Sequence, residues 1–192
     1  MRRGLGILLA AAVIMSATGC TPVGGGLTGV GVDAEGHPII VLAWCDGAAP
    51  EHAIVFRARG SAGTAPQDDP SDLPGGTASA EATREVRFNA PSLDGNSASF
   101  RLDAPADGWA AESEPLVLEA GVTYNARGWK GSGYTQVSTQ DVSFTAGDVA
   151  ELKPGQVLVQ QLDEKTQAIR WIDAVISREE FDRQGRDPAS CE

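Results

Sequence analysis

Residues 38–45 read Pro-Ile-Ile-Val-Leu-Ala-Trp-Cys, a run without a charged side chain. A short, continuous apolar run is typical of a strand that is covered on both faces. The stretch Asp33-Ala-Glu-Gly36 stands before it and has the composition of a turn, and residues 27–32 form another apolar segment before that turn. We therefore predict two consecutive strands over residues 27–32 and 38–45.

Beyond these strands the chain alternates apolar and polar residues, which is typical of strands with one buried face. Residues 53–59, for example, place Ile54 and Phe56 on the predicted inner face and Arg57 on the outer one. Further strands are predicted over residues 85–90, 97–102, 115–119, 122–129, 136–145 and 156–162. Many short strands with few helical segments indicate an all-β fold, and we expect an antiparallel β-sandwich.

The segment Leu118-Glu-Ala-Gly-Val-Thr-Tyr124 resembles the tyrosine corner of immunoglobulin-like and fibronectin type III domains. In those domains a Tyr at the start of a strand hydrogen-bonds back to the backbone of the preceding corner. The resemblance covers seven residues and implies an immunoglobulin-like, Greek-key sandwich. Cys45 and Cys191, however, are farther apart in the chain than the inter-sheet cysteine pair of antibody domains.

A short C-terminal helix is predicted over residues 178–184. Ser177 and Glu180 have the spacing of a capping box, and Gly185 follows as a stop signal. Phe181 is the expected buried contact of this helix, which would direct the C-terminus back toward Cys45.

Three other segments are predicted from local composition. Asp148 and Glu151 repeat the capping-box spacing and predict about one helical turn. Residues 168–176 fit either a helical stripe or a strand, and the preceding strand and turn favour a hairpin. Residues 60–84 are rich in Pro, Asp and Gly and poor in large apolar side chains, so we expect a mobile insertion between two strands.

The N-terminus has the pattern of an export signal. Arg2 and Arg3 precede an uncharged apolar run over residues 4–15, which is too short to span a bilayer. The following Ala17-Thr-Gly-Cys20 resembles the lipobox of bacterial lipoproteins, in which the cysteine is acylated. In composition, which is rich in Ala, Gly and Arg and includes only three Lys, the chain resembles lipoproteins of the kind common in actinobacteria. An ordinary secretory signal is the alternative, and a twin-arginine signal is less favoured because the rest of that motif is missing.

The lipobox resemblance implies the organisation of the chain. Residues 1–19 would be the signal peptide, Cys20 the lipidated residue, residues 20–26 a flexible tether, and residues 27–192 a single sandwich domain. A lipidated cysteine would place the protein at the extracytoplasmic face of the cell membrane, because two or more acyl chains hold a protein stably on a bilayer.

Two of the three cysteines remain once Cys20 carries lipid. In the oxidising environment outside the cytoplasm, the pair Cys45 and Cys191 indicates a disulfide. A free buried thiol at Cys45 or a reactive thiol at Cys191 is the alternative, but neither has a nearby cluster of His or Lys that would lower its pKa.

Composition and motifs exclude several classes of function. A formal net charge of −11 disfavours nucleic-acid binding, which depends on clustered Lys and Arg that contact phosphates. Residues 24–29 match G-x-G-x-x-G but lack the preceding strand of a dinucleotide site. His37 and His52 have no partners at zinc spacing, and the acidic residues 68–72 lack the spacing of a calcium loop. We therefore predict no cofactor, no metal and no catalytic residue.

Trp129 and Tyr134 are the candidate binding residues, because they flank a Gly- and Ser-containing loop after a predicted strand. The sequence favours a non-catalytic interaction or ligand-binding module with an envelope protein or peptide as partner. The alternative is a cell-envelope hydrolase that uses an unrecognised pair of carboxylates.

Overall fold

The computed structural model describes residues 23–58, 85–163, 170–187 and 190–191. The predicted signal peptide, Cys20 and the insertion at residues 60–84 lie outside these residues. The strands are β1 (Val23–Val32), β2 (Pro38–Trp44), β3 (His52–Arg57), β4 (Glu85–Asn89), β5 (Ser97–Arg101), β6 (Ala110–Ala111), β7 (Thr123–Lys130), β8 (Val137–Gln140), β9 (Val142–Thr145), β10 (Gln156–Leu162) and β11 (Trp171–Ser177). The helices are η1 (Gly133–Thr135), α1 (Ala146–Glu151) and α2 (Arg178–Gln184).

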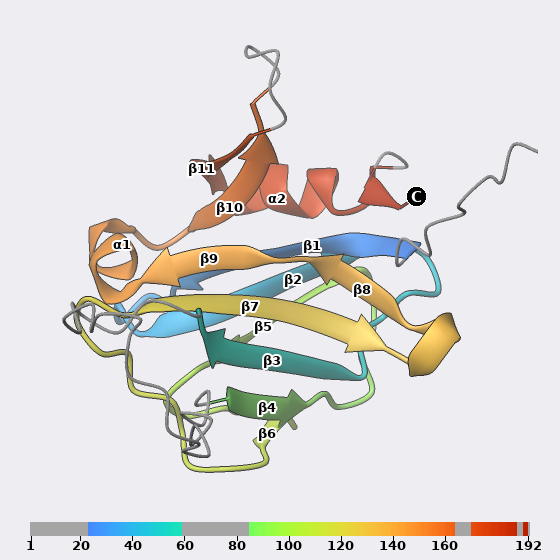
Figure 1. The fold of residues 1–192 in the computed structure, drawn as a ribbon, viewed down its shortest axis with the longest axis horizontal. Coiled ribbons are helices and arrows are strands. Elements are labelled where there is room, and N and C mark those ends of the chain that lie inside the picture. Colours follow the sequence, from blue (N-terminus) through green and yellow to red (C-terminus); the bar gives the residue numbers. More distant parts are fainter. Residues whose placement is uncertain (1–22, 59–84, 164–169, 188–189, 192) are drawn as a thin grey trace, which may run out of the picture.

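The strands form one curled, mixed sheet (Figure 1). Strand β1 is shared: it pairs with β2 on one side, and on the other with β8 and then with β10. The β1–β8 pair is parallel, whereas the other pairs of described strands are antiparallel. Strands dominate the described residues, so the coarse prediction of a β-rich fold is confirmed. The expectation of purely antiparallel pairing is wrong, because β1 and β8 are parallel.

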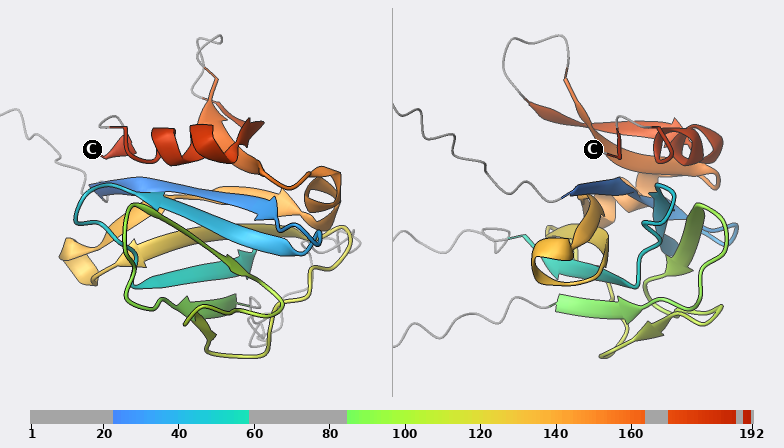
Figure 2. Two further views of the ribbon diagram at one scale, coloured as in Figure 1. Left: turned by 180° about the vertical axis from the view of Figure 1, so that it is seen from behind. Right: turned by 90° about the vertical axis from the view of Figure 1, so that its right-hand side faces the viewer.

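Strand β2 is covered on both faces, as predicted. The side chains of Ile40, Leu42 and Trp44 point into the main core, which lies inside the curl of the sheet. Val41 and Ala43 point the other way, into a second cluster beneath α2, β10 and β11. Both views in Figure 2 show these three elements stacked over β1. The apolar run therefore reflects two separate cores that share one strand.

Strand β1 begins at Val23, so residues 23–26 belong to the sheet and not to the predicted tether. Its glycines permit close packing. A Cβ at Gly29 would collide with the Val157 side chain and would lie 3.0 Å from both the Leu158 carbonyl oxygen and the Phe181 ring. The Gly-rich sequence thus lets β10 and α2 lie directly against β1.

The tyrosine corner is present. The hydroxyl oxygen of Tyr124 accepts a hydrogen bond from the backbone N–H of Glu119 at 3.0 Å, and the Tyr124 ring is fully buried beside Phe144. Residues 115–119 were predicted as a strand, but they form no ladder. In this segment Leu116 turns its side chain into the core and its N–H donates to the carbonyl of Leu102.

Two further predictions needed correction. The strand expected over residues 136–145 is interrupted at Asp141, because β8 pairs with β1 while β9 pairs only with β7. In β3 the faces are reversed: Ala53 and Val55 point into the core, not Ile54. Ile54 is nevertheless only 8% exposed, because it lies on the outer face between two arginines, Arg87 on β4 and Arg127 on β7.

The capping residues determine where the two α-helices begin. Helix α1 begins one turn earlier than predicted, because Thr145 and Asp148 form the capping box. Helix α2 has the predicted bounds, with the Ser177 hydroxyl accepting from the N–H of Glu180. Hydrogen bonds from Arg183 and Gln184 lower the pKa of Glu180 to about 2. None of the described helices is long and apolar enough to cross a membrane.

The Cys45–Cys191 disulfide is present, with an S–S distance of 1.98 Å and a Cα–Cα distance of 5.9 Å. Phe181, fully buried in the second cluster, holds α2 beside β2. Gly185, at the end of α2, packs so closely on Ala43 that a Cβ would collide with it. The helix therefore brings the C-terminus to Cys45, as predicted.

Candidate interaction surface

No described strand pairs with the outer edge of β11, which is called the open edge below. β11 is the last strand of the sheet, and β10 is its only partner among the described strands. At the end of the hairpin the N–H of Asp163 donates to the carbonyl of Arg170 at 2.8 Å. Hydrogen-bonded and non-hydrogen-bonded pairs alternate along an antiparallel ladder. Since Arg170 is in a hydrogen-bonded pair, every second residue after Arg170, beginning with Trp171, is in a non-hydrogen-bonded pair. The backbone N–H and carbonyl groups of Trp171, Asp173 and Val175 therefore point away from β10.

The β10–β11 hairpin also carries most of the exposed large apolar side chains among the described residues. Trp171 is 54% exposed, Val175 51%, Leu162 46% and Ile172 39%. Trp171 and Leu162 are cross-strand partners, so they form one exposed pair at the tip of the hairpin. Exposed apolar side chains on an unpaired edge are unusual, because they invite pairing with another chain.

A cleft of about 460 Å³ lies between α1 and the hairpin. Leu158 and Val175, which are cross-strand partners, line it on the hairpin side, together with Gln156 and Asp173. Leu152 contributes an apolar side chain at the end of α1. Asp173 and Val175 therefore have their side chains at the cleft and their backbone groups at the open edge of β11.

The rim of the cleft is acidic. Asp148, Glu151 and Asp173 line it, against a single cation, Lys153. The carboxylate of Asp148 is held in the capping box of α1, where it accepts from the backbone N–H and the hydroxyl of Thr145. Asp173 is exposed and accepts a hydrogen bond from the Gln160 amide at 3.2 Å. The cleft thus favours a partner that brings positive charge.

Trp129 and Tyr134, the binding residues expected from the sequence, are not part of the β10–β11 hairpin: Trp129 lies in β7, which β10, β1 and β8 separate from β11 in the sheet order. Trp129 is half-buried on the outer face of β7, where its ring stacks on His52 with the centroids 5.1 Å apart. His52 is held in turn by Asn89, 2.9 Å away. Tyr134 lies in η1, and its side chain is outside the described part of the structure. Trp129 therefore already has an aromatic partner within the fold.

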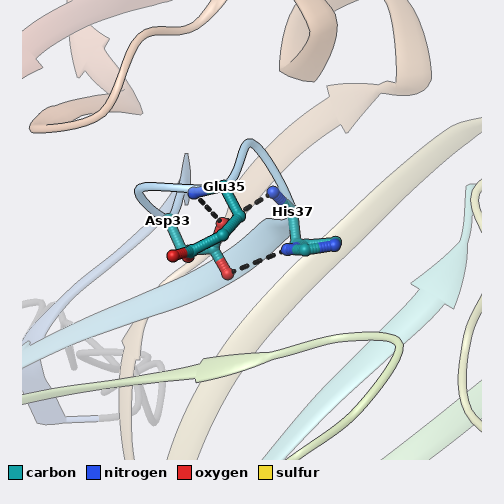
Figure 3. Close-up of side chains that lie close together, drawn as sticks. All are labelled: Asp33, Glu35 and His37. Atoms are coloured by element: carbon teal, nitrogen blue, oxygen red, sulfur yellow. Dashed lines mark hydrogen bonds and ion pairs between the residues drawn. The ribbon is translucent and has the colours of Figure 1, made fainter.

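The sequence did not indicate the cluster of Asp33, Glu35 and His37 in the β1–β2 turn (Figure 3). One ligand atom from each lies within 4.8 Å of the others. Asp33 accepts from the backbone N–H groups of Glu35 and His37 at 3.0 and 2.8 Å, and its second oxygen lies 3.2 Å from the His37 ring nitrogen. Partial burial raises the pKa of Asp33, but these hydrogen bonds outweigh it and the pKa lies below its usual value. The cluster holds the turn together, and we assign no metal to it.

Comparison with protein-family models yields no match for this chain, and neither do searches of curated proteins and of solved structures.

Proposed function

We propose that the protein is a membrane-anchored, extracytoplasmic lipoprotein that acts as a non-catalytic interaction module, with the β10–β11 hairpin as its binding surface. The observation that carries this proposal is the open, apolar edge of β11 beside the acidic cleft. Loops and edges on a rigid sheet are common recognition sites, and exposed Trp side chains are frequent anchors at interfaces. The partner we expect is an envelope protein or peptide.

The position of β1 supports this arrangement. Because β1 begins at Val23, only two residues separate it from Cys20. Acyl chains on Cys20 would hold that end of the sheet close to the bilayer. In Figure 1, α1 lies at the opposite end of β1 from the start of that strand. Residues of α1 line the cleft, so the cleft would face away from the membrane.

An immunoglobulin-like, Greek-key relationship is part of the same proposal. The hydrogen bond between Glu119 and Tyr124 supports it, since this corner is a feature of such sandwiches. The parallel β1–β8 pair is a departure from that pattern.

The lipid anchor is tested by metabolic labelling with a palmitate analogue in the native host. We expect the wild type to be labelled and to fractionate with membranes. The Cys20→Ala variant should lose both properties, because Cys20 is the cysteine that accepts the lipid. Thr21→Ala, which changes the neighbouring residue and leaves Cys20 and the disulfide in place, is the matched control and should keep the label. An unlabelled wild type, or equal labelling of the Cys20→Ala variant, would contradict the anchor.

The interaction surface is tested by a photo-reactive amino acid in place of Leu162, which is exposed and lies opposite Trp171. In intact cells we expect a crosslink to a discrete envelope protein, and we expect Val175→Pro to abolish it, since proline blocks the open edge of β11. The same probe at Ser99, on edge strand β5, is the control and should give no such product. Identical products from both positions, or none from Leu162, would refute the assignment of this surface.

A further inference from the structure

We infer that the partner binds as an extended strand added to the outer edge of β11, and that it carries a basic residue between two apolar ones, in the pattern apolar–x–basic–x–apolar. This inference rests on the proposed function, because it specifies the chemistry of the segment that the β10–β11 surface would bind.

The backbone of β11 determines the mode of binding. The N–H and carbonyl groups of Trp171, Asp173 and Val175 point to the open edge, so an added strand can form hydrogen-bonded pairs with these three residues. Strand β11 is seven residues long, which is sufficient for such a ladder. Residues directly opposite each other in a ladder have side chains on the same face. The partner residues opposite these three would therefore project on the cleft side.

The side chains on that face determine the pattern. Trp171 and Val175 are each more than half exposed, so apolar residues opposite them would bury surface that now faces water. Asp173 lies between them and is exposed, and a Lys or Arg directly opposite would form a cross-strand ion pair. Asp148 and Glu151 on the far rim of the cleft add negative charge near the same place.

A second copy of this chain fits the edge less well. Two β11 strands paired about a two-fold axis centred on Asp173 would place the two Asp173 carboxylates opposite each other, which is destabilising. Each copy also carries a formal net charge of −11, so the bodies repel at low ionic strength. The acidic edge favours a segment of opposite charge.

The test uses two capped peptides, TVTKTVT and TVTETVT, and the purified full-length protein. The sequences read the same in both directions, so the result does not depend on whether the added strand is parallel or antiparallel. We expect the Lys peptide to bind about fivefold more tightly than the Glu peptide, from the change between an attractive and a repulsive cross-strand pair. In Asp173→Lys the preference should reverse.

Val175→Pro should abolish binding of both peptides, because it removes an outward N–H while leaving the bonds to β10 in place. Ser99→Pro makes the same change on edge strand β5 and should bind as the wild type does; thermal unfolding of both variants establishes that they are folded.

Equal affinity for the two peptides, no binding by the wild type, or full binding by folded Val175→Pro would overturn the inference. Dimerisation of the protein that Val175→Pro abolishes would overturn it as well. If the peptides fail while the Leu162 crosslink persists, the interaction surface stands and only the strand-addition pattern is wrong.

Discussion

Removing the Cys45–Cys191 disulfide is expected to lower the free energy of unfolding by about 5 kcal/mol, because the cross-link restricts the unfolded chain over a very long loop. The two cysteines are 146 residues apart in the sequence. The bridge also joins the end of β2 to the segment after α2, so it secures the last part of the chain to the central strands. A loss of this size is comparable to the whole stability of many small domains.

The measurement is urea unfolding of the wild type with and without reductant, and of the double variant Cys45→Ser, Cys191→Ser. The double variant should match the reduced wild type and should not respond to reductant. The background Cys20→Ala removes the third cysteine, and the same difference is expected there. A loss below about 1 kcal/mol would show that native contacts of α2, and not the cross-link, hold the C-terminus.

The sequence predicted the features that depend on local pattern. Alternation located most strands, and the apolar run from Ile39 to Trp44 predicted a strand with two buried faces, which the two clusters confirm. The Ser177 cap and Phe181 predicted α2 within its observed bounds. These predictions were correct because each depends on residues that are close together in the sequence.

Pairing between distant strands could not be predicted in the same way. The parallel β1–β8 pair joins residues more than a hundred positions apart, and nothing in either segment specifies its partner. The alternation in β3 was also misleading. Ile54 is apolar yet faces outward, where its cross-strand neighbours are Arg87 and Arg127 and it is only 8% exposed. Long arginine side chains can cover an apolar neighbour with their aliphatic stems, so an outward-facing position can still hold a buried Ile.

The sequence did not indicate the proposed interaction surface, for a related reason. Residues 168–176 were recognised as half of a hairpin, but their position at the sheet edge depends on the pairing of the whole sheet. The usable signal was the sequence Trp171-Ile172 followed by Val175, which places apolar residues on both faces of a strand outside the main core. Trp129 was predicted as a binding residue because it is an aromatic residue beside a loop; in the fold its ring stacks on its cross-strand neighbour His52.

The second large effect is expected at Phe181. Its side chain is fully buried among residues of β1, β2 and β10, and it is the buried residue of a helix only seven residues long. A helix of that length is not stable by itself, so α2 depends on this contact. Phe181→Ala should therefore lower the free energy of unfolding by about 3–5 kcal/mol, from lost burial and from the cavity left behind.

Phe181→Leu is the matched variant and should cost less, because it keeps most of the apolar volume. The two large effects can be separated by hydrogen exchange. In Phe181→Ala with the disulfide intact, the amides of α2 should lose protection while those of β7 and β3 keep theirs, since Phe181 belongs to the second cluster and not to the main core. Equal loss of protection in both regions would mean that the two clusters unfold as one unit. The docking of α2, and with it the support beneath the β10–β11 surface, would then be inseparable from the stability of the sheet.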